Sequence, residues 1–275
     1  MASDQLTSIE RLSLNQITTE QWNLKEAVEG CARNEVPWIA LWRHKIEEIG
    51  LSQSKKLIQD AGLKVSSICR GGMFPAPTAA ERQQRLDDNR RAIEEAAELG
   101  ADVLVLVCGP APDKDIEQAR KWVEEGIEQL IPFAKDHGVK LGIEPLHPMY
   151  AADRSVIVSL AHANDIAEKH QPDEVGVVVD VFHVWWDPDV YNQIARAKGR
   201  ILGFHVSDWA VPMPDMLKGR AMMGDGVIEL RKLRKAAEAA GYTGPIEVEI
   251  FNQAIWDMDG DDVLKLMKER YLEHC

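Results

Sequence analysis

Acidic and histidine side chains gather in the second half of this 275-residue chain, each beside a short run of aliphatic or β-branched residues. They stand at Glu144 and His147, Asp180 and His183, His205 and Asp208, and Glu247 and Glu249. A charge at the end of a buried strand costs several kcal/mol unless something pairs with it. The first question is therefore what compensates a residue such as Asp180, which ends the apolar run 175–179.

Four of these side chains can meet if their strands are neighbours in one parallel sheet. Side chains on a strand alternate between two faces, so Glu247 and Glu249 share a face. Glu249 is nearer the carboxyl end of its strand, and we therefore choose it over Glu247. Glu144, Asp180 and His205 complete the set.

This set of three carboxylates and one imidazole points to a divalent metal ion. The carboxylates cannot all be ionised at such close range without a cation. Carboxylate oxygens with one imidazole suit a hard or borderline divalent ion, such as Mn²⁺, Mg²⁺ or Co²⁺. A structural zinc site would normally contain more cysteine or histidine. One acidic residue at a strand end is usually solvated or a helix cap, so the inference depends on the alignment of all four.

Short β-branched or aliphatic runs alternate with segments of helical periodicity along the chain. The runs occupy 11–16, 36–42, 64–70, 102–108, 140–146, 175–183, 201–207 and 245–251. Between the fourth and fifth runs, one helical face carries Ile116, Ala119, Val123, Ile127 and Leu130. Four helix-to-strand joints carry a glycine, the residue that most readily ends a helix.

This alternation predicts an α/β fold, a (β/α)₈ TIM barrel that forms a single catalytic domain over residues 1–275. The chemistry of such a barrel gathers at the carboxyl ends of its strands, where the four chosen residues stand. An open doubly wound sheet is the alternative fold. It usually has a glycine-rich nucleotide loop after its first strand, and the segment 12–22 contains no glycine.

The composition bears on partners and compartment. The chain has 32 Lys and Arg against 45 Asp and Glu, a formal net charge of −13, so we expect neither nucleic acid nor a membrane surface as a partner. No segment approaches the ~20 apolar residues of a membrane helix. The four cysteines share no short metal-binding spacing. Residues 1–16 lack the apolar core of a signal peptide, and we expect a cytoplasmic protein with reduced thiols.

Five motifs carry a resemblance to a known family. They are GIEPL (142–146), VDVFH (179–183), FHVSD (204–208), the segment from Arg220 to GDG (224–226), and EVEIF (247–251). Over nearly its whole length the chain resembles the xylose-isomerase-like barrels, specifically the sugar phosphate isomerase/epimerase group. The resemblance implies that the four residues chosen above bind Mn²⁺, with Mg²⁺, Co²⁺ or Zn²⁺ as alternatives. It also implies substrate contacts from His183 and Arg220.

The activity implied by this resemblance is proton transfer next to the carbonyl of a small-molecule keto-sugar. The metal would bind the carbonyl and the neighbouring hydroxyl and hold the enediolate that forms. Glu144 and Glu249 would lie on opposite faces of the reacting carbon, one removing the proton and the other returning it. We therefore predict a metal-dependent sugar isomerase or epimerase of carbohydrate metabolism.

A lyase of the same fold is the alternative function. Inosose dehydratases and enzymes that cleave 3-keto-glycosides or C-glycosides resemble this group, and they expel a leaving group by β-elimination. His147 is the candidate base for such a reaction, and the tryptophans at the strand ends hint at a bulky substrate group. Trp185 and Trp186 are equally consistent with packing. The further candidates for substrate binding are Trp42, Trp185, Arg43, His44 and Arg70. No cluster is obviously built for phosphate.

Two other function classes share the barrel. Apurinic endonucleases with three zinc ions need additional histidines on the third and fourth strands, where this chain has ICRGG (68–72) and VCGPA (107–111). A sugar-binding protein without catalysis would not need both Glu144 and Glu249 as acid–base groups. We favour neither class.

The segment 209–226 is long for a connection in a compact domain. It contains two prolines, four methionines and Arg220. Long loops are usually functional or mobile, and exposed methionine suits adaptable surfaces. We expect this segment to cover the site and to help form a homo-oligomer or hetero-oligomer interface.

Overall fold

Eight parallel strands close into a barrel in the computed structural model, which describes residues 5–275. The strands follow one another around the barrel in chain order, and the last pairs with the first. They are β1 (Leu12–Asn15), β2 (Trp38–Trp42), β3 (Lys64–Gly72), β4 (Val103–Val107), β5 (Lys140–Ile143), β6 (Val175–Asp180), β7 (Ile201–Val206) and β10 (Ile246–Val248). The predicted TIM barrel is confirmed, and each predicted run overlaps one of these strands.

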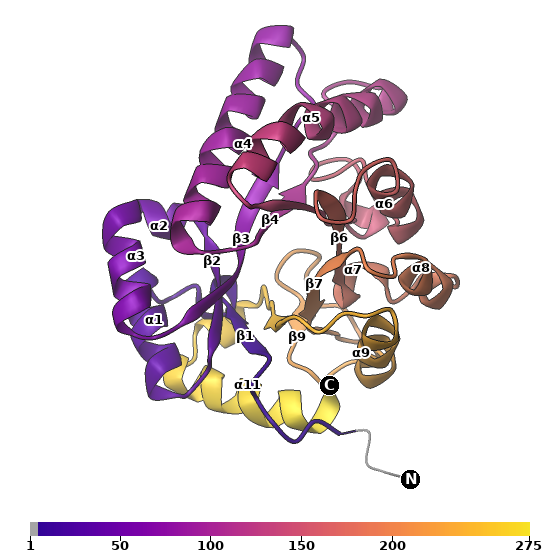
Figure 1. The fold of residues 1–275 in the computed structure, drawn as a ribbon. Helices are drawn as coiled ribbons and strands as arrows, with labels where there is room; N and C mark the ends of the chain where they lie inside the picture. The colour runs from indigo at the N-terminus through magenta and orange to yellow at the C-terminus, as the bar shows by residue number, and fades with distance from the viewer. Residues whose placement is uncertain (1–4) are drawn as a thin grey trace.

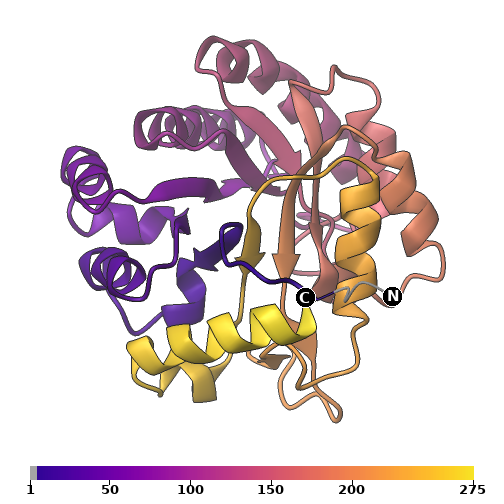
Figure 2. The ribbon, with the colours of Figure 1, turned by 60° about the horizontal axis from the view of Figure 1, so that its bottom comes forward.

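Helices surround the strands, as Figure 1 shows, and Figure 2 shows α11 running along the outside of the barrel. The longer helices are α1 (Leu24–Arg33), α3 (Leu51–Asp60), α4 (Ala79–Leu99), α5 (Ile116–Asp136), α6 (Leu160–Ala167), α9 (Leu230–Ala239) and α11 (Gly260–His274). The shorter ones are α2 (Arg43–Glu47), α7 (Val181–Val184), α8 (Val190–Arg196), α10 (Gln253–Trp256) and the 3₁₀ turns η1 (Gln16–Thr19) and η2 (Pro148–Tyr150). Capping boxes fix the starts of α1 and α4.

The helical stripe predicted between the fourth and fifth strands is the inner face of α5. Four of its five residues are buried, and Ile116, in the first turn, is 36% exposed. The predicted helix ends also hold, because the glycines at the four joints have positive φ. The values are 67° at Gly62, 74° at Gly100, 70° at Gly138 and 93° at Gly241.

The segment after β7 forms a small antiparallel ribbon of β8 (Asp208–Trp209) and β9 (Arg220–Ala221). The buried Asp208 carboxylate anchors this segment by accepting backbone N–H bonds from Trp209, Gly224 and Ile228 at 2.8–3.0 Å. Of the four methionines, Met222 and Met223 are in the core. A role of this segment in covering the site or in oligomerisation stays a prediction.

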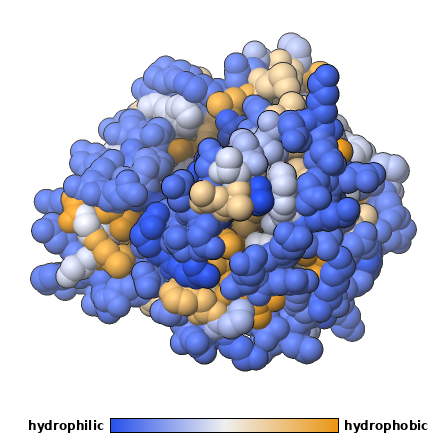
Figure 3. Space-filling view, turned by 90° about the horizontal axis from the view of Figure 1, so that it is seen from above, coloured by the Kyte–Doolittle hydropathy of each residue, from blue (hydrophilic) through white to orange (hydrophobic). Residues whose placement is uncertain are grey.

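The surface seen from above in Figure 3 is mostly hydrophilic, with hydrophobic residues in small separate patches. Within the described residues, no helix is long and apolar enough to cross a membrane. Cys31, Cys69, Cys108 and Cys275 are buried free thiols. The expectation about a signal peptide concerns a segment whose residues 1–4 lie outside the described part of the chain.

Candidate functional site

The four residues chosen as metal ligands converge at the carboxyl end of the barrel. Glu144, Asp180, His205 and Glu249 are all buried, and each offers a ligand atom within 4.8 Å of the others. Strand register explains part of this convergence, because His205 in β7 is level with Asp180 in β6. Glu144 and Glu249 each lie one residue beyond the last paired residue of their strand. Their backbone N–H groups still donate to carbonyl oxygens of the neighbouring strands β4 and β7.

Glu247 is a further acidic side chain at this site, on the same strand as Glu249, and the sequence analysis set it aside in favour of Glu249. It is level with His205 in the barrel, and its Oε2 lies 3.1 Å from His205 Nε2. This contact turns the opposite ring atom, Nδ1, toward Glu144 and Glu249, at 3.2 and 3.5 Å. A carboxylate behind a metal-binding histidine fixes the ring orientation and raises its basicity.

Asn15 connects the first strand to the same group of carboxylates. Its Nδ2 donates to Glu247 Oε2 at 3.3 Å and to Glu249 Oε1 at 3.4 Å, and its Oδ1 accepts from Trp42 Nε1 at 2.8 Å. Asn15 therefore holds the Trp42 ring and the Glu249 carboxylate in one hydrogen-bond chain.

Arg220 compensates two of the ligand carboxylates directly. Its Nη1 lies 2.8 Å from Asp180 Oδ2 and 3.1 Å from Glu249 Oε2, and all three side chains are almost fully buried. The guanidinium stands over the rings of Phe182 and Phe251, 4.6 and 5.2 Å from their centroids. A buried, paired and stacked guanidinium is held rigidly, which suits a donor that must be in place before substrate binds.

His183 lies one helical turn after Asp180, on α7. Asp180 caps this helix by accepting the N–H of Phe182 at 2.9 Å, which places the His183 Nε2 3.6 Å from Asp180 Oδ2 and 3.1 Å from Arg220 Nη2. Burial lowers the pKa of His183 to about 3, so the ring is neutral.

Burial and neighbouring charges also set the ionisation of the side chains predicted as metal ligands. Burial raises the pKa of Glu144 to about 7. Burial opposes ionisation of Glu249 as well, but the positive charge of Arg220 and the contact with His205 hold the pKa of Glu249 below its usual value. Burial would lower the pKa of His205, yet the carboxylates around it, led by Glu247, raise it well above the ordinary range.

The donor set fits a divalent cation. Glu144 Oε1 and His205 Nδ1 are buried, and neither makes a hydrogen bond within residues 5–275, although they lie only 3.2 Å apart. Two buried polar atoms that lie this close without forming a hydrogen bond are placed as two ligands of one ion would be. Oxygen-rich donors with one imidazole suit Mn²⁺, Mg²⁺ or Co²⁺ better than the sulfur-rich set of a structural zinc site.

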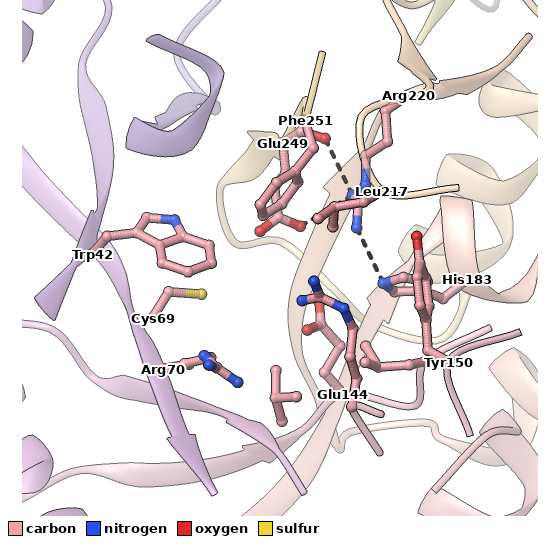
Figure 4. A pocket seen from close by; sticks show the side chains of 13 residues that line it. Trp42, Cys69, Arg70, Glu144, Tyr150, His183, Leu217, Arg220, Glu249 and Phe251 are labelled. Atoms are coloured by element: carbon pink, nitrogen blue, oxygen red, sulfur yellow. Dashed lines mark hydrogen bonds and ion pairs between the residues drawn. The ribbon is translucent and has the colours of Figure 1, made fainter. Parts of the chain in front are cut away.

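A cavity of about 110 Å³ opens beside this cluster (Figure 4). In the figure, Trp42, Cys69 and Arg70 form one wall, and Glu249, Arg220 and His183 form the other. The remaining lining residues are Val107, Glu144, Leu146, Tyr150, Arg154, Leu217 and Phe251. Sequence reasoning did not single out Tyr150, Arg154 or Leu217, because they stand in loops or turns without a periodic pattern, and it named Phe251 only as part of the run 245–251 and the motif EVEIF.

The predicted substrate residues divide between this cavity and its surroundings. Trp42, Arg70, His183 and Arg220 line it. Arg43 and His44 line a neighbouring cavity instead, and Arg43 is bound to the carboxylates of Asp88 and Glu95. Substrate binding by these residues stays a prediction, and the two ion pairs give Arg43 a structural role of its own.

His147 and Trp185 belong to an aromatic cluster outside the cavity lining. The His147 ring lies 5.5 Å from Trp186 and 5.1 Å from Trp209, and its Nδ1 accepts the Met149 N–H at 3.1 Å. Trp185 lies 5.5 Å from Trp209 between ring centroids. Burial lowers the pKa of His147. The catalytic role predicted for His147 is not tested by this geometry.

Comparison with known proteins agrees with this architecture. Two curated relatives are an inosose isomerase of Halalkalibacterium halodurans, 22% identical over 96% of this chain and 95% of that protein, and the L-ribulose-5-phosphate 3-epimerase UlaE of Escherichia coli K12, 23% identical over 73% of this chain and 69% of that protein. Both names describe enzymes that act on small sugars or sugar-like substrates, which supports an enzyme acting on carbohydrates.

Solved structures give the same fold. The protein SMc04130 of Sinorhizobium meliloti 1021 is 49% identical, with a TM-score of 0.95 over 98% of this chain and 99% of that one. The IOLI protein with a binding zinc atom is 19% identical, with a TM-score of 0.84 over 96% and 97% of the two chains. A sequence model of the xylose isomerase-like TIM barrels matches residues 26–270. The chain therefore belongs to the xylose isomerase-like TIM barrel family.

Proposed function

We propose that the protein is a divalent-metal-dependent isomerase or epimerase of keto-sugars that moves a proton at the carbon next to the carbonyl. The observation that carries this proposal is the convergence of Glu144, Asp180, His205 and Glu249 within 4.8 Å, beside a cavity lined by His183 and Arg220. The names of the inosose isomerase and the 3-epimerase among its relatives support the same class of reaction.

The metal is proposed to be Mn²⁺, held by the four converging side chains. A divalent cation there would polarise the substrate carbonyl and stabilise the negative charge that develops when a proton leaves the neighbouring carbon. Glu247 keeps the His205 ring oriented for this role, and Asn15 steadies the Glu249 carboxylate.

Glu144 and Glu249 are the proposed acid–base pair. They extend from β5 and β10, which are separated in the barrel by β6 and β7, so they approach the site from different sides. Each carboxylate can then reach a different face of a flat intermediate carbon, and removal from one face with return to the other inverts the stereocentre. Transfer within one face would instead give isomerisation.

Arg220 and His183 are proposed to orient the substrate. Arg220 directs N–H donors from a buried, stacked position, and the neutral His183 ring can bond a hydroxyl without adding charge. Apolar side chains at Val107, Leu146, Leu217 and Phe251 restrict water in the cavity. Restricted water protects a carbanion-like intermediate from unwanted protonation.

Solvent isotope exchange tests the proposal. Protein loaded with Mn²⁺ is incubated with free ketoses and inososes in deuterium oxide, and the products are analysed by NMR and mass spectrometry. Deuterium at the carbon next to the carbonyl with an intact carbon skeleton is the expected result. Protein that holds no divalent metal and gains no exchange activity with Mn²⁺ would overturn it. Glu29→Gln, on the exposed face of α1, is the matched control for Glu144→Gln and Glu249→Gln.

The lyase alternative uses the same cavity but needs a base for elimination. His147, the residue predicted for that role, lies outside the cavity lining and uses Nδ1 as a hydrogen-bond acceptor within its own turn. We put the isomerase or epimerase first, and the lyase stays the alternative. In the deuterium experiment, release of water or of an aglycone would identify a lyase.

A further inference from the structure

Arg70 and Arg154 bring two positive charges to the cavity from segments far apart in the sequence. Arg70 stands near the carboxyl end of β3, and Arg154 follows the turn η2 after the Glu144 strand. Both line the central cavity, and Figure 4 shows Arg70 on the wall opposite His183 and Arg220. Arg70 also lines the neighbouring cavity, which contains Arg85.

Neither guanidinium has a carboxylate partner within the described residues. The side-chain bond of Arg70 runs from Nη1 to the weakly accepting thioether of Met73, at 3.3 Å. Arg154 stands over the Tyr150 ring at 5.5 Å from its centroid, and its buried Nε has no hydrogen-bond partner. Two cationic side chains that line one cavity without a carboxylate partner leave donors that an anionic ligand can satisfy.

The absence of carboxylate partners for Arg70 and Arg154 does not reflect a shortage of acidic residues, because the chain has 45 Asp and Glu against 32 Lys and Arg. Arg43, which begins α2 after the neighbouring strand β2, has two carboxylates from α4, and Arg220 has two from the carboxylate cluster. Burial lowers the pKa of Arg70, and the positive charges of Arg154 and Arg85 lower it further, against the opposing effect of Cys69 and Glu144. An oxyanion between the guanidinium groups would remove this repulsion.

We infer that Arg70 and Arg154 form an anion subsite, and that the substrate is a keto-sugar carrying an oxyanion group, as a phosphate ester or a carboxylate. This inference rests on the proposed function for the reacting end of the substrate. Arg70 lies on the wall opposite the carboxylate cluster's own arginine, so we assign the pair to the non-reacting end. Guanidinium groups bind both carboxylate and phosphate through paired N–H donors.

Such a subsite would select substrates by charge. Binding energy from the non-reacting end of a substrate positions its reacting carbon, so a neutral sugar of the same skeleton should react poorly. The expectation differs from the sequence analysis, which found no cluster for phosphate, because Arg70 and Arg154 are 84 positions apart (154 minus 70) and only the fold places them on one cavity.

Calorimetric titration tests the subsite without requiring turnover. The full-length Mn²⁺-loaded protein is titrated with inorganic phosphate and, separately, with acetate, as wild type and as Arg70→Gln, Arg154→Gln and the double variant. Arg33→Gln, an exposed arginine on α1, controls for the loss of one positive charge. We expect each single variant to weaken binding of one of these anions at least about tenfold, and Arg33→Gln to leave it unchanged.

The anion that binds more tightly to the wild type identifies the substrate group as phosphate ester or carboxylate. An anion bound directly by the metal would survive in the double variant, so equal binding by the wild type and the double variant overturns the subsite. Equal loss in Arg33→Gln overturns it as well. The single variants decide the question if the double variant does not fold.

Turnover with matched sugars separates this inference from the proposed function. D-ribulose is compared with D-ribulose 5-phosphate, and D-fructose with D-fructuronate, in the deuterium exchange experiment. Exchange in a neutral sugar that equals that in its charged partner contradicts the subsite but supports the reaction class. Anion binding that depends on Arg70 and Arg154, without exchange in any sugar, contradicts the reaction class but keeps the subsite.

Discussion

The strands β5, β6, β7 and β10 and the strands β2 and β3 meet at one cavity but treat charge differently. On the first group, Glu144, Asp180, Glu247 and Glu249 each have an arginine or imidazole nitrogen within 4.0 Å. On the second group, Arg70 has no carboxylate oxygen within 4.0 Å among the described residues. The first wall balances its own charges and could hold a metal ion, and the second leaves a positive charge on Arg70 that no carboxylate of the described residues pairs.

This comparison teaches that burial alone does not identify the reacting groups. Arg43 follows β2 and Arg70 lies in the neighbouring strand β3, yet only Arg43 is neutralised by protein carboxylates. A charge that the fold pairs internally stabilises the barrel, whereas one that it leaves unpaired is available to a ligand. The largest effects of substitution are expected on the wall formed by β5, β6, β7 and β10, where the charges are paired.

The strongest test replaces the proposed acid–base carboxylates. Glu144→Gln and Glu249→Gln keep the side-chain size but cannot exchange a proton and bind a divalent ion more weakly. Turnover should fall by about 10²–10⁴-fold in each, the range for loss of a general acid–base group. Isotope exchange rates measured at saturating Mn²⁺ check this, and a variant that keeps most of the wild-type rate would remove that residue from the mechanism.

Glu247→Gln tests the carboxylate behind His205. The amide oxygen can still lie against His205 Nε2, so the variant isolates the loss of negative charge. We expect the affinity for Mn²⁺ or the turnover to fall about 10–100-fold, as for other partners of metal-binding histidines. Titration with Mn²⁺ followed by electron paramagnetic resonance measures it. Unchanged affinity and turnover would reduce Glu247 to a packing residue.

The pH dependence of metal binding tests Glu144 and His205 on the same wall without a substitution. Without a cation, burial raises the pKa of Glu144 to about 7, and the neighbouring carboxylates raise that of His205 well above its usual value. A metal must displace these protons, so its affinity is lower where they are bound and rises as pH rises. Displacement of one proton predicts about a tenfold gain per pH unit below the pKa of that group. Titrations at pH 6, 7 and 8 should show it, and a pH-independent affinity would contradict it.

The barrel and the four ligands could be predicted because both follow from simple periodicities. Strands with a period of two, joined by helices that end in glycine, leave few ways to fold, and the carboxyl ends of the strands collect Glu144, Asp180, His205 and Glu249. The role of Glu247 could not be assigned, because it depends on the register that sets it level with His205.

The place of Arg154 in the cavity and the partners of Arg43 could not be predicted from the sequence, for a different reason. Arg154 lies in an irregular segment, where no period indicates which way a side chain points. The pairing of Arg43 with Asp88 and Glu95 is a contact between α2 and α4, and a charge on a helix surface has many equivalent partners in a sequence. Long-range pairing decides which cations are free, and only the folded chain shows it.

His147→Ala is expected to have the smallest effect and separates the two candidate reactions. Its backbone N–H bond to His183 Nδ1 at 3.1 Å survives the substitution, whereas the ring contacts with Trp186 and Trp209 are lost. An isomerase or epimerase should keep its rate within a few-fold, with a stability loss of about 1 kcal/mol from the side-chain cap bond to Met149. A lyase that uses His147 as its base should instead lose about 10²–10⁴-fold in rate. Rates on the best substrate, together with thermal unfolding of the same sample, distinguish a small loss through stability from a large loss through chemistry.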